Sequence, residues 1–186
     1  MSDQFRSKRE AKQLIEESFR QGGTRFFYFY NDLTPIPEYN SAIITCMDCR
    51  ITTENLGIFY PGKVIIIRTA GALFTPDVLR SLLISIYELK VTNIAVVGHL
   101  DCGGKMSNEK MKELVKKISN EIKKSENEIL NILGKRSASE EFLGFTNVEE
   151  QVKKTVKTIK SHPLIPKTVE VNGYIYNPHN GTIVQN

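Results

Sequence analysis

The sequence predicts an α/β fold built on a mainly parallel sheet of four to five strands flanked by helices. Three short apolar runs, at 41–46, 64–68 and 93–99, lack the polar alternation of half-exposed strands and are typical of strands buried on both faces. Helical patterns separate the second run from the third and follow the third, and this alternation favours parallel pairing with right-handed crossovers. In such sheets ligands bind beyond the carboxyl ends of the strands.

The N-terminal part is expected to form a helix and an aromatic arm. Apolar residues recur at helical spacing over 5–20, and Gly22-Gly23 is a stop signal. Five consecutive aromatic residues follow at 26–30, before a loop that contains Pro35 and Pro37.

Start and stop signals define the later helices. Thr75 can cap a helix whose first residue is Pro76. One long amphipathic helix is predicted over 106–133, because apolar residues line one face until Gly134. Thr146 and Glu149 have the spacing of a capping box.

That last helix is expected to stop before Pro163, and two strand signals follow it. Residues 168–177 are expected to form a strand, and 177–182 read as a turn into a short final strand.

Length and composition indicate one domain over residues 1–186. The 186 residues suffice for a hydrophobic core, and no apolar run approaches the roughly 20 residues of a membrane-spanning helix. The polar start has no apolar stretch of a secretory signal, so a cytoplasmic location is expected. Three cysteines are too few for a disulfide framework, which favours metal ligation or thiol reactivity.

The net charge of +4 does not indicate a nucleic-acid partner. Residues 105–136 hold nine basic and five acidic residues, an excess equal to that of the whole chain. No aromatic residue is interleaved with these charges, as it would be in many nucleic-acid surfaces. We therefore expect a solvated helix face.

Candidate metal ligands follow the first and third strands. Cys46 ends the first strand, and His99 and Cys102 come at the end of the third. Parallel strands deliver these side chains to one edge of the sheet, where two thiolates and an imidazole form a Cys₂His set with an open fourth position. Such soft ligands favour zinc.

Cys49 leaves a second arrangement open. With Cys46, His99 and Cys102 it spells four tetrahedral ligands, which would make a closed structural zinc site without chemistry. A fold that can bury a hydrophobic core without metal has little need of a structural zinc site for its stability. A redox role for the Cys46-x-x-Cys49 pair lacks a thioredoxin-like context.

Asp48 and Arg50 are candidates for the chemistry beside the metal. Side chains alternate in an extended segment, so these two residues tend to share a face with Cys46. The carboxylate can accept a hydrogen bond from a metal-bound water, and the guanidinium can keep that carboxylate ionised and oriented.

Taken together, these motifs resemble the β-class carbonic anhydrases. Cys46-x-Asp48-x-Arg50 followed by His99-x-x-Cys102-Gly103 is similar to the family's two motifs, and Arg68-Thr69-Ala70-Gly71 is similar to its Arg-Asn-Ala-Gly segment. The resemblance runs from about residue 38 to 105. Thr69 and Cys49 depart from the usual pattern.

The resemblance implies a zinc enzyme with one Zn²⁺ per subunit. Cys46, His99 and Cys102 would be the ligands, and Asp48 with Arg50 the catalytic dyad. Arg68, Gly71 and Gly103 would surround the metal and the substrate pocket, with Cys49 as a possible extra ligand. In some family members the aspartate itself takes the fourth zinc position. A homodimer or homotetramer is implied, with residues 1–37 used in dimerisation.

The function implied is reversible hydration of CO₂ to bicarbonate and a proton, by attack of a zinc-bound hydroxide. Carbonic anhydrase is itself the standard example of zinc acidifying its bound water. One relative on the same fold hydrolyses CS₂ or COS instead, which is the nearest alternative. A zinc-stabilised, non-catalytic interaction domain is the alternative of a different class.

Overall fold

The computed structural model describes residues 13, 15–17, 19, 33–135, 137–138 and 142–186. Contacts within the chain divide it into two units, residues 1–35 and residues 36–186. The predicted helix over 5–20 lies for the most part outside the described residues, and the aromatic run at 26–30 lies wholly outside them. The second unit holds the sheet and the candidate site.

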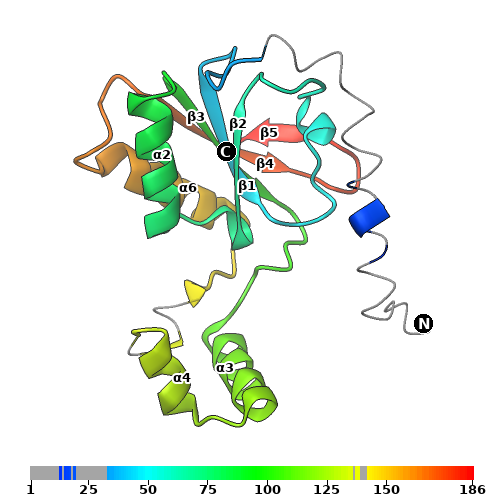
Figure 1. Cartoon of the computed structure of the whole chain (residues 1–186), viewed down its shortest axis with the longest axis vertical. Coiled ribbons are helices and arrows are strands. Elements are labelled where there is room, and N and C mark those ends of the chain that lie inside the picture. Colours follow the sequence, from blue (N-terminus) through cyan, green and yellow to red (C-terminus); the bar gives the residue numbers. More distant parts are fainter. Residues whose placement is uncertain (1–12, 14, 18, 20–32, 136, 139–141) are drawn as a thin grey trace. The chain divides into compact units, whose positions relative to one another are not determined.

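A five-stranded, mainly parallel sheet forms the centre of this unit (Figure 1). Its strands are β1 (Ser41–Cys46), β2 (Ile65–Thr69), β3 (Asn93–His99), β4 (Glu170–Tyr176) and β5 (Ile183–Gln185). They follow the spatial order β2-β1-β3-β4-β5, with parallel pairing throughout except for the antiparallel β5. The predicted α/β fold is confirmed.

The order of the strands places a switch point at the end of β1. The chain goes from β1 to β2 on one side, and β3 pairs with β1 on the other side. Because β1, β2 and β3 are parallel, their carboxyl ends share one edge of the sheet. Cys46, opposite Thr69 in the register, and His99 both lie at that edge.

Two helices cover one face of the sheet. Figure 1 shows α2 (Pro76–Tyr87) and α6 (Val148–Ser161) on the same side of the strands. The Thr75 hydroxyl caps α2 as predicted, accepting from the N–H of Val78. The core between helices and sheet is aliphatic, and its fully buried members include Ile44, Leu82, Val96, Val152 and Ile159.

Two glycines let α6 approach the sheet closely. A Cβ added to Gly98 on β3 would lie 2.5 Å from Val152 Cγ2, and one added to Gly173 on β4 would lie 2.7 Å from Val152 Cγ1. Both distances are shorter than van der Waals contact, so a side chain at either position would push the helix away.

The predicted helix over 106–133 is two helices, and the single-helix prediction is wrong. α3 (Asn108–Ile122) ends where Lys123 takes a left-handed conformation, with φ of 58°. α4 (Glu126–Ile132) then starts with a capping box formed by Ser125 and Glu128. The two helices share a small apolar cluster with Met111, Val115, Ile129 and Ala138 as its buried members.

The remaining differences are small. Asn147, rather than Thr146, caps α6, its side-chain oxygen accepting from the N–H of Glu150. Two 3₁₀ turns, η2 (Glu54–Leu56) and η3 (Ala70–Ala72), follow β1 and β2. Among the described residues, no helix has the length and apolarity needed to cross a membrane.

Candidate metal centre

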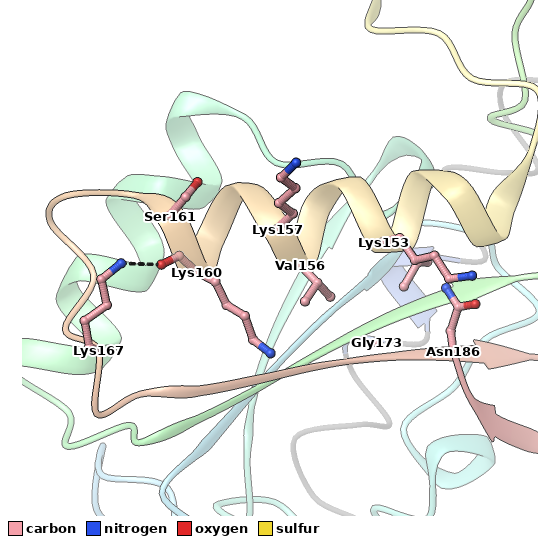
Figure 2. A pocket seen from close by; sticks show the side chains of 9 residues that line it. Lys153, Val156, Lys157, Lys160, Ser161, Lys167, Gly173 and Asn186 are labelled. Atoms are coloured by element: carbon pink, nitrogen blue, oxygen red, sulfur yellow. Dashed lines mark hydrogen bonds between the residues drawn. The ribbon is translucent and has the colours of Figure 1, made fainter.

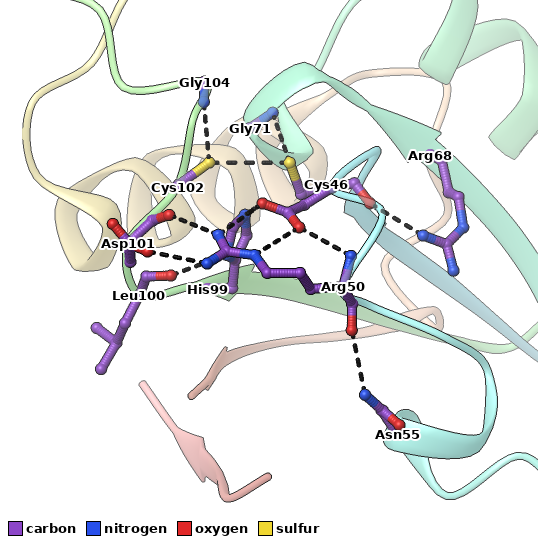
Figure 3. A network of polar contacts seen from close by, with 11 residues as sticks. Cys46, Arg50, Asn55, Arg68, Gly71, His99, Leu100, Asp101, Cys102 and Gly104 are labelled. Carbon is purple, nitrogen blue, oxygen red and sulfur yellow. Dashed lines mark hydrogen bonds and ion pairs between the residues drawn. The ribbon is translucent and has the colours of Figure 1, made fainter. Parts of the chain in front are cut away.

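Cys46, His99 and Cys102 converge at the carboxyl edge of the sheet. Cys46 is the last residue of β1, His99 is the last of β3, and Cys102 follows in the next loop. Their candidate ligand atoms all lie within 4.8 Å of one another, and the two sulfurs are 3.8 Å apart (Figure 3). All three side chains are buried, as a dry metal site requires.

The two ring nitrogens of His99 have different surroundings. Nδ1–H donates to the carbonyl oxygen of Leu100 at 2.9 Å, which leaves Nε2 as the unprotonated nitrogen of the neutral ring. His99 is 1% exposed, and Nε2 finds no hydrogen-bond partner among the described residues. A buried nitrogen without a partner is costly, and a metal ion would satisfy it.

Backbone N–H groups face both sulfurs. The N–H of Gly71 lies 3.4 Å from the Cys46 sulfur, and the N–H of Gly104 lies 3.4 Å from the Cys102 sulfur (Figure 3). Gly71 adopts φ of 76°, and a Cβ there would lie 2.4 Å from the Phe145 ring. Only glycine fits that position, so the residue type is required to aim this N–H at the sulfur.

The cluster favours a thiolate even without metal. A hydrogen bond from the Cys102 thiol lowers the pKa of Cys46 to about 4, against the raising effect of burial. The same interaction and burial raise the pKa of Cys102, so the pair shares one proton. Burial lowers the pKa of His99, but the Cys46 sulfur and Asp48 raise it by more, and the net shift is upward.

Asp48 is held beside the cluster by Arg50. Nε of Arg50 donates to Oδ1 at 2.9 Å and Nη2 donates to Oδ2 at 2.8 Å, so the pair is bidentate. The hydrogen bonds from Arg50 hold the pKa of Asp48 well below its usual range. Oδ2 of the carboxylate lies 3.7 Å from His99 Nε2, close to where a metal would be bound.

Arg50 has a second partner that sequence reasoning missed. Nη1 donates to Oδ2 of Asp101 at 2.9 Å, and Nη2 donates to the main-chain oxygen of Asp101 at 2.8 Å (Figure 3). The only signal in the sequence was an acidic residue inside the His-x-x-Cys spacing.

The other predicted site residues occupy different positions. Arg68 supports the loop after β1 by donating to the main-chain oxygens of Cys46 and Ile51. Gly103 is exposed, and an added Cβ would meet no atom within 4 Å, whereas its neighbour Gly104 faces a sulfur. Cys49 is exposed and lies outside the metal-ligand cluster of the described residues.

Two large cavities lie away from these residues. One, of about 460 Å³, runs along α6 and is lined by Val156, Gly173 and Asn186 with four lysines, Lys153, Lys157, Lys160 and Lys167 (Figure 2). The other, of about 520 Å³, lies between α6 and the loop at 143–147. Neither is lined by Cys46, His99 or Cys102.

Comparisons with known proteins identify the family. Residues 41–183 match the family model described as Carbonic anhydrase. The chain is 34% identical over 158 residues to YvdA of Bacillus subtilis, which carries a provisional carbonic anhydrase name, covering 81% of this chain and 78% of that protein. It is 35% identical over 147 residues to a carbon disulfide hydrolase of Acidianus sp., covering 72% and 71%.

A solved structure agrees with these matches. The carbonic anhydrase of Streptococcus mutans superposes with a TM-score of 0.72 at 29% identity, covering 94% of this chain and 95% of that one. With the family model spanning nearly the whole sheet unit and the fold shared, the chain belongs to the β-carbonic anhydrase family of enzymes.

Proposed function

We propose that the chain catalyses the reversible hydration of CO₂ to bicarbonate and a proton at a zinc site formed by Cys46, His99 and Cys102. The observation that carries the proposal is the orphaned Nε2 of His99, buried with two sulfurs and beside an arginine-held carboxylate. Membership of the carbonic anhydrase family supports the choice of reaction.

The residues present fit zinc. Two thiolates and a neutral imidazole are zinc's preferred soft and borderline ligands, and three of them leave a position for a reactant. When bound, zinc supplies Lewis acidity, which would lower the pKa of a water molecule enough to give a nucleophilic hydroxide near neutral pH.

The chain's own hydrogen bonds orient the three ligand side chains around that position. The Nδ1–H bond to Leu100 fixes the His99 tautomer, so that Nε2 points its lone pair at the ligand cluster. Gly71 and Gly104 hold the sulfurs through their N–H groups, which moderates the negative charge of the thiolates. These contacts orient the three ligand groups through main-chain atoms.

Asp48 is the group that handles the reacting water. Paired with Arg50, its carboxylate stays ionised at neutral pH and can only accept a hydrogen bond. An acceptor beside the metal position orients a water O–H toward itself and leaves an oxygen lone pair free to attack the carbon of CO₂. Arg50 therefore acts by keeping Asp48 charged and fixed.

Hydrolysis of CS₂ or COS is the second candidate, because a relative at 35% identity is named carbon disulfide hydrolase. These linear molecules present an electrophilic carbon to the same nucleophile. Water replaces sulfur, and each sulfur leaves as H₂S, so COS consumes one water and CS₂ consumes two on the way to CO₂. Access to the site, rather than the ligand set, would separate the two activities.

The test compares the zinc-loaded chain on both substrates. Stopped-flow CO₂ hydration and H₂S release from CS₂ and COS are measured side by side, with Asp48→Asn as the matched inactive control. We expect CO₂ hydration that falls by about a hundredfold or more in Asp48→Asn. H₂S release without CO₂ hydration would establish the hydrolase. If the chain binds one zinc but turns over none of these substrates, the remaining hypothesis is a zinc-stabilised, non-catalytic domain.

A further inference from the structure

Arg50 is held from two sides by two different loops. On one side it pairs with Asp48, two residues away in the loop after β1. On the other side it contacts Asp101, which lies 51 residues further on in the loop after β3. The chain of contacts from Asp48 through Arg50 to Asp101 therefore joins the loop after Cys46 to the loop between His99 and Cys102. Figure 3 shows the contact between Arg50 and Asp101.

The backbone at Asp101 is shaped for this contact. Asp101 adopts a left-handed conformation, with φ of 52°, which aspartate tolerates better than most residues do. Its carboxylate and its main-chain oxygen then both accept from Arg50, at 2.9 and 2.8 Å. A left-handed non-glycine residue between two candidate ligands is a local cost that the two hydrogen bonds offset.

We propose that Asp101 is a positioning residue, which holds the Arg50 guanidinium in place for Asp48 and ties together the two loops that carry the metal ligands. The inference rests on the proposed function, because it assigns the role through Arg50 and Asp48. An arginine side chain has many rotamers, and Arg50 is 42% exposed, so one aspartate alone leaves it freer than two on opposite sides do.

Stability alone is a poor explanation of this contact. The Asp101 side chain is 65% exposed, and ion pairs in such surroundings add little to folding. Removal of the carboxylate should therefore leave the folded chain intact while the geometry around Asp48 loosens. That separation between folding and turnover distinguishes a positioning role from a structural one.

The test uses Asp101→Gly and Asp101→Asn in the zinc-loaded, full-length chain. Glycine accepts the left-handed backbone without steric strain but has no carboxylate, whereas asparagine tolerates the same backbone and keeps an oxygen acceptor. On whichever of CO₂ or CS₂ the parent turns over, kcat/KM is expected to fall by about tenfold in Asp101→Gly, the size of one partly exposed charge-assisted hydrogen bond. Asp101→Asn should recover most of that loss.

The second arm asks whether the effect runs through Arg50. In an Arg50→Ala background, adding Asp101→Gly should change kcat/KM by less than about twofold, because the group that it positions is gone. Glu38→Gln is the matched control, since Glu38 is a 60% exposed carboxylate paired with Lys63 away from the site. An unchanged kcat/KM in Asp101→Gly, or an equal loss in the Arg50→Ala background, would overturn the proposal.

A crystal structure of Asp101→Gly supplies the readout that does not need activity. We expect the Arg50 guanidinium to leave its position in the parent, or to occupy several. If the parent turned over no substrate, the proposed function would fail, and the position of Arg50 would still decide this inference. Arg50 unmoved in Asp101→Gly would refute it.

Discussion

At the scale of single residues, three side chains from two strand ends meet while a fourth, close in sequence, does not. Cys46, His99 and Cys102 are buried with their ligand atoms within 4.8 Å of one another. Cys49, three residues after Cys46, is exposed. The geometry thus favours the open three-ligand arrangement over the closed four-ligand one.

Serine substitutions at Cys49 and Cys102 test this arrangement. Cys102→Ser removes a thiolate from the cluster, and zinc affinity is expected to fall by more than the roughly hundredfold that loss of an outer contact costs. Cys49→Ser should keep one zinc per chain, because this thiol lies outside the cluster. Metal analysis after dialysis against a chelator measures the zinc content of both variants. Loss of zinc from Cys49→Ser as well as from Cys102→Ser would support the closed four-ligand site instead.

Much of this site could be predicted from spacing, because parallel strands bring their carboxyl ends to one edge. That rule finds Cys46 and His99. Asp48 and Arg50 do pair, but in a turn after β1 and not in the extended segment that the alternation argument assumed. Asp101 could not be found in this way, since its contact with Arg50 depends on a left-handed turn that no spacing reveals. The same holds for Gly104, whose contribution is a backbone N–H.

At the scale of elements, strand predictions were closer than helix predictions. The apolar runs at 41–46 and 93–99 match β1 and β3 because burial on both faces leaves no alternative pattern. The break between α3 and α4 was missed because apolar residues continue on one face across it. The sequence did contain a local signal for a new helix start, the capping-box pair Ser125 and Glu128. This signal outweighed the apolar periodicity that runs across both helices.

The capping box of α4 makes this helix sensitive to acid. The N–H of Ser125 donates to Glu128, which lowers the pKa of that carboxyl. A lowered folded pKa means that the cap stabilises above the unfolded value of about 4.3, and that this contribution is lost as the pH falls through the folded value. Glu128→Gln keeps a neutral acceptor and does not titrate.

We therefore expect the parent to be more stable than Glu128→Gln at about pH 6 and to lose that advantage by about pH 3. Urea unfolding of both chains at the two pH values measures the difference. Glu121→Gln, on α3, is the control for removing a glutamate charge outside a cap. An advantage of the parent that did not shrink in acid would contradict the role of the charged cap.

At the scale of the whole molecule, some large apolar side chains stay exposed to solvent. Within the described residues, Phe59, Ile132 and Val184 are well exposed. The N-terminal part has five consecutive aromatic residues at 26–30 in its sequence. Aromatic side chains are enriched in the cores of protein interfaces.

We predict that the chain is a dimer or tetramer in solution and that the aromatic run supplies part of the interface. Sedimentation velocity at micromolar concentration should give at least twice the mass of one chain. Replacing two aromatics of the run, Phe27→Ser with Phe29→Ser, should lower that mass, because the interface loses the largest apolar side chains that it buries. Phe59→Ser, at an exposed aromatic of the other unit, is the matched control. Circular dichroism checks that each variant is folded, so that a lower mass reports weaker assembly and not unfolding.

A parent chain that sediments as a monomer would refute the predicted assembly. An equal decrease of mass in Phe59→Ser would indicate that the interface lies outside the aromatic run.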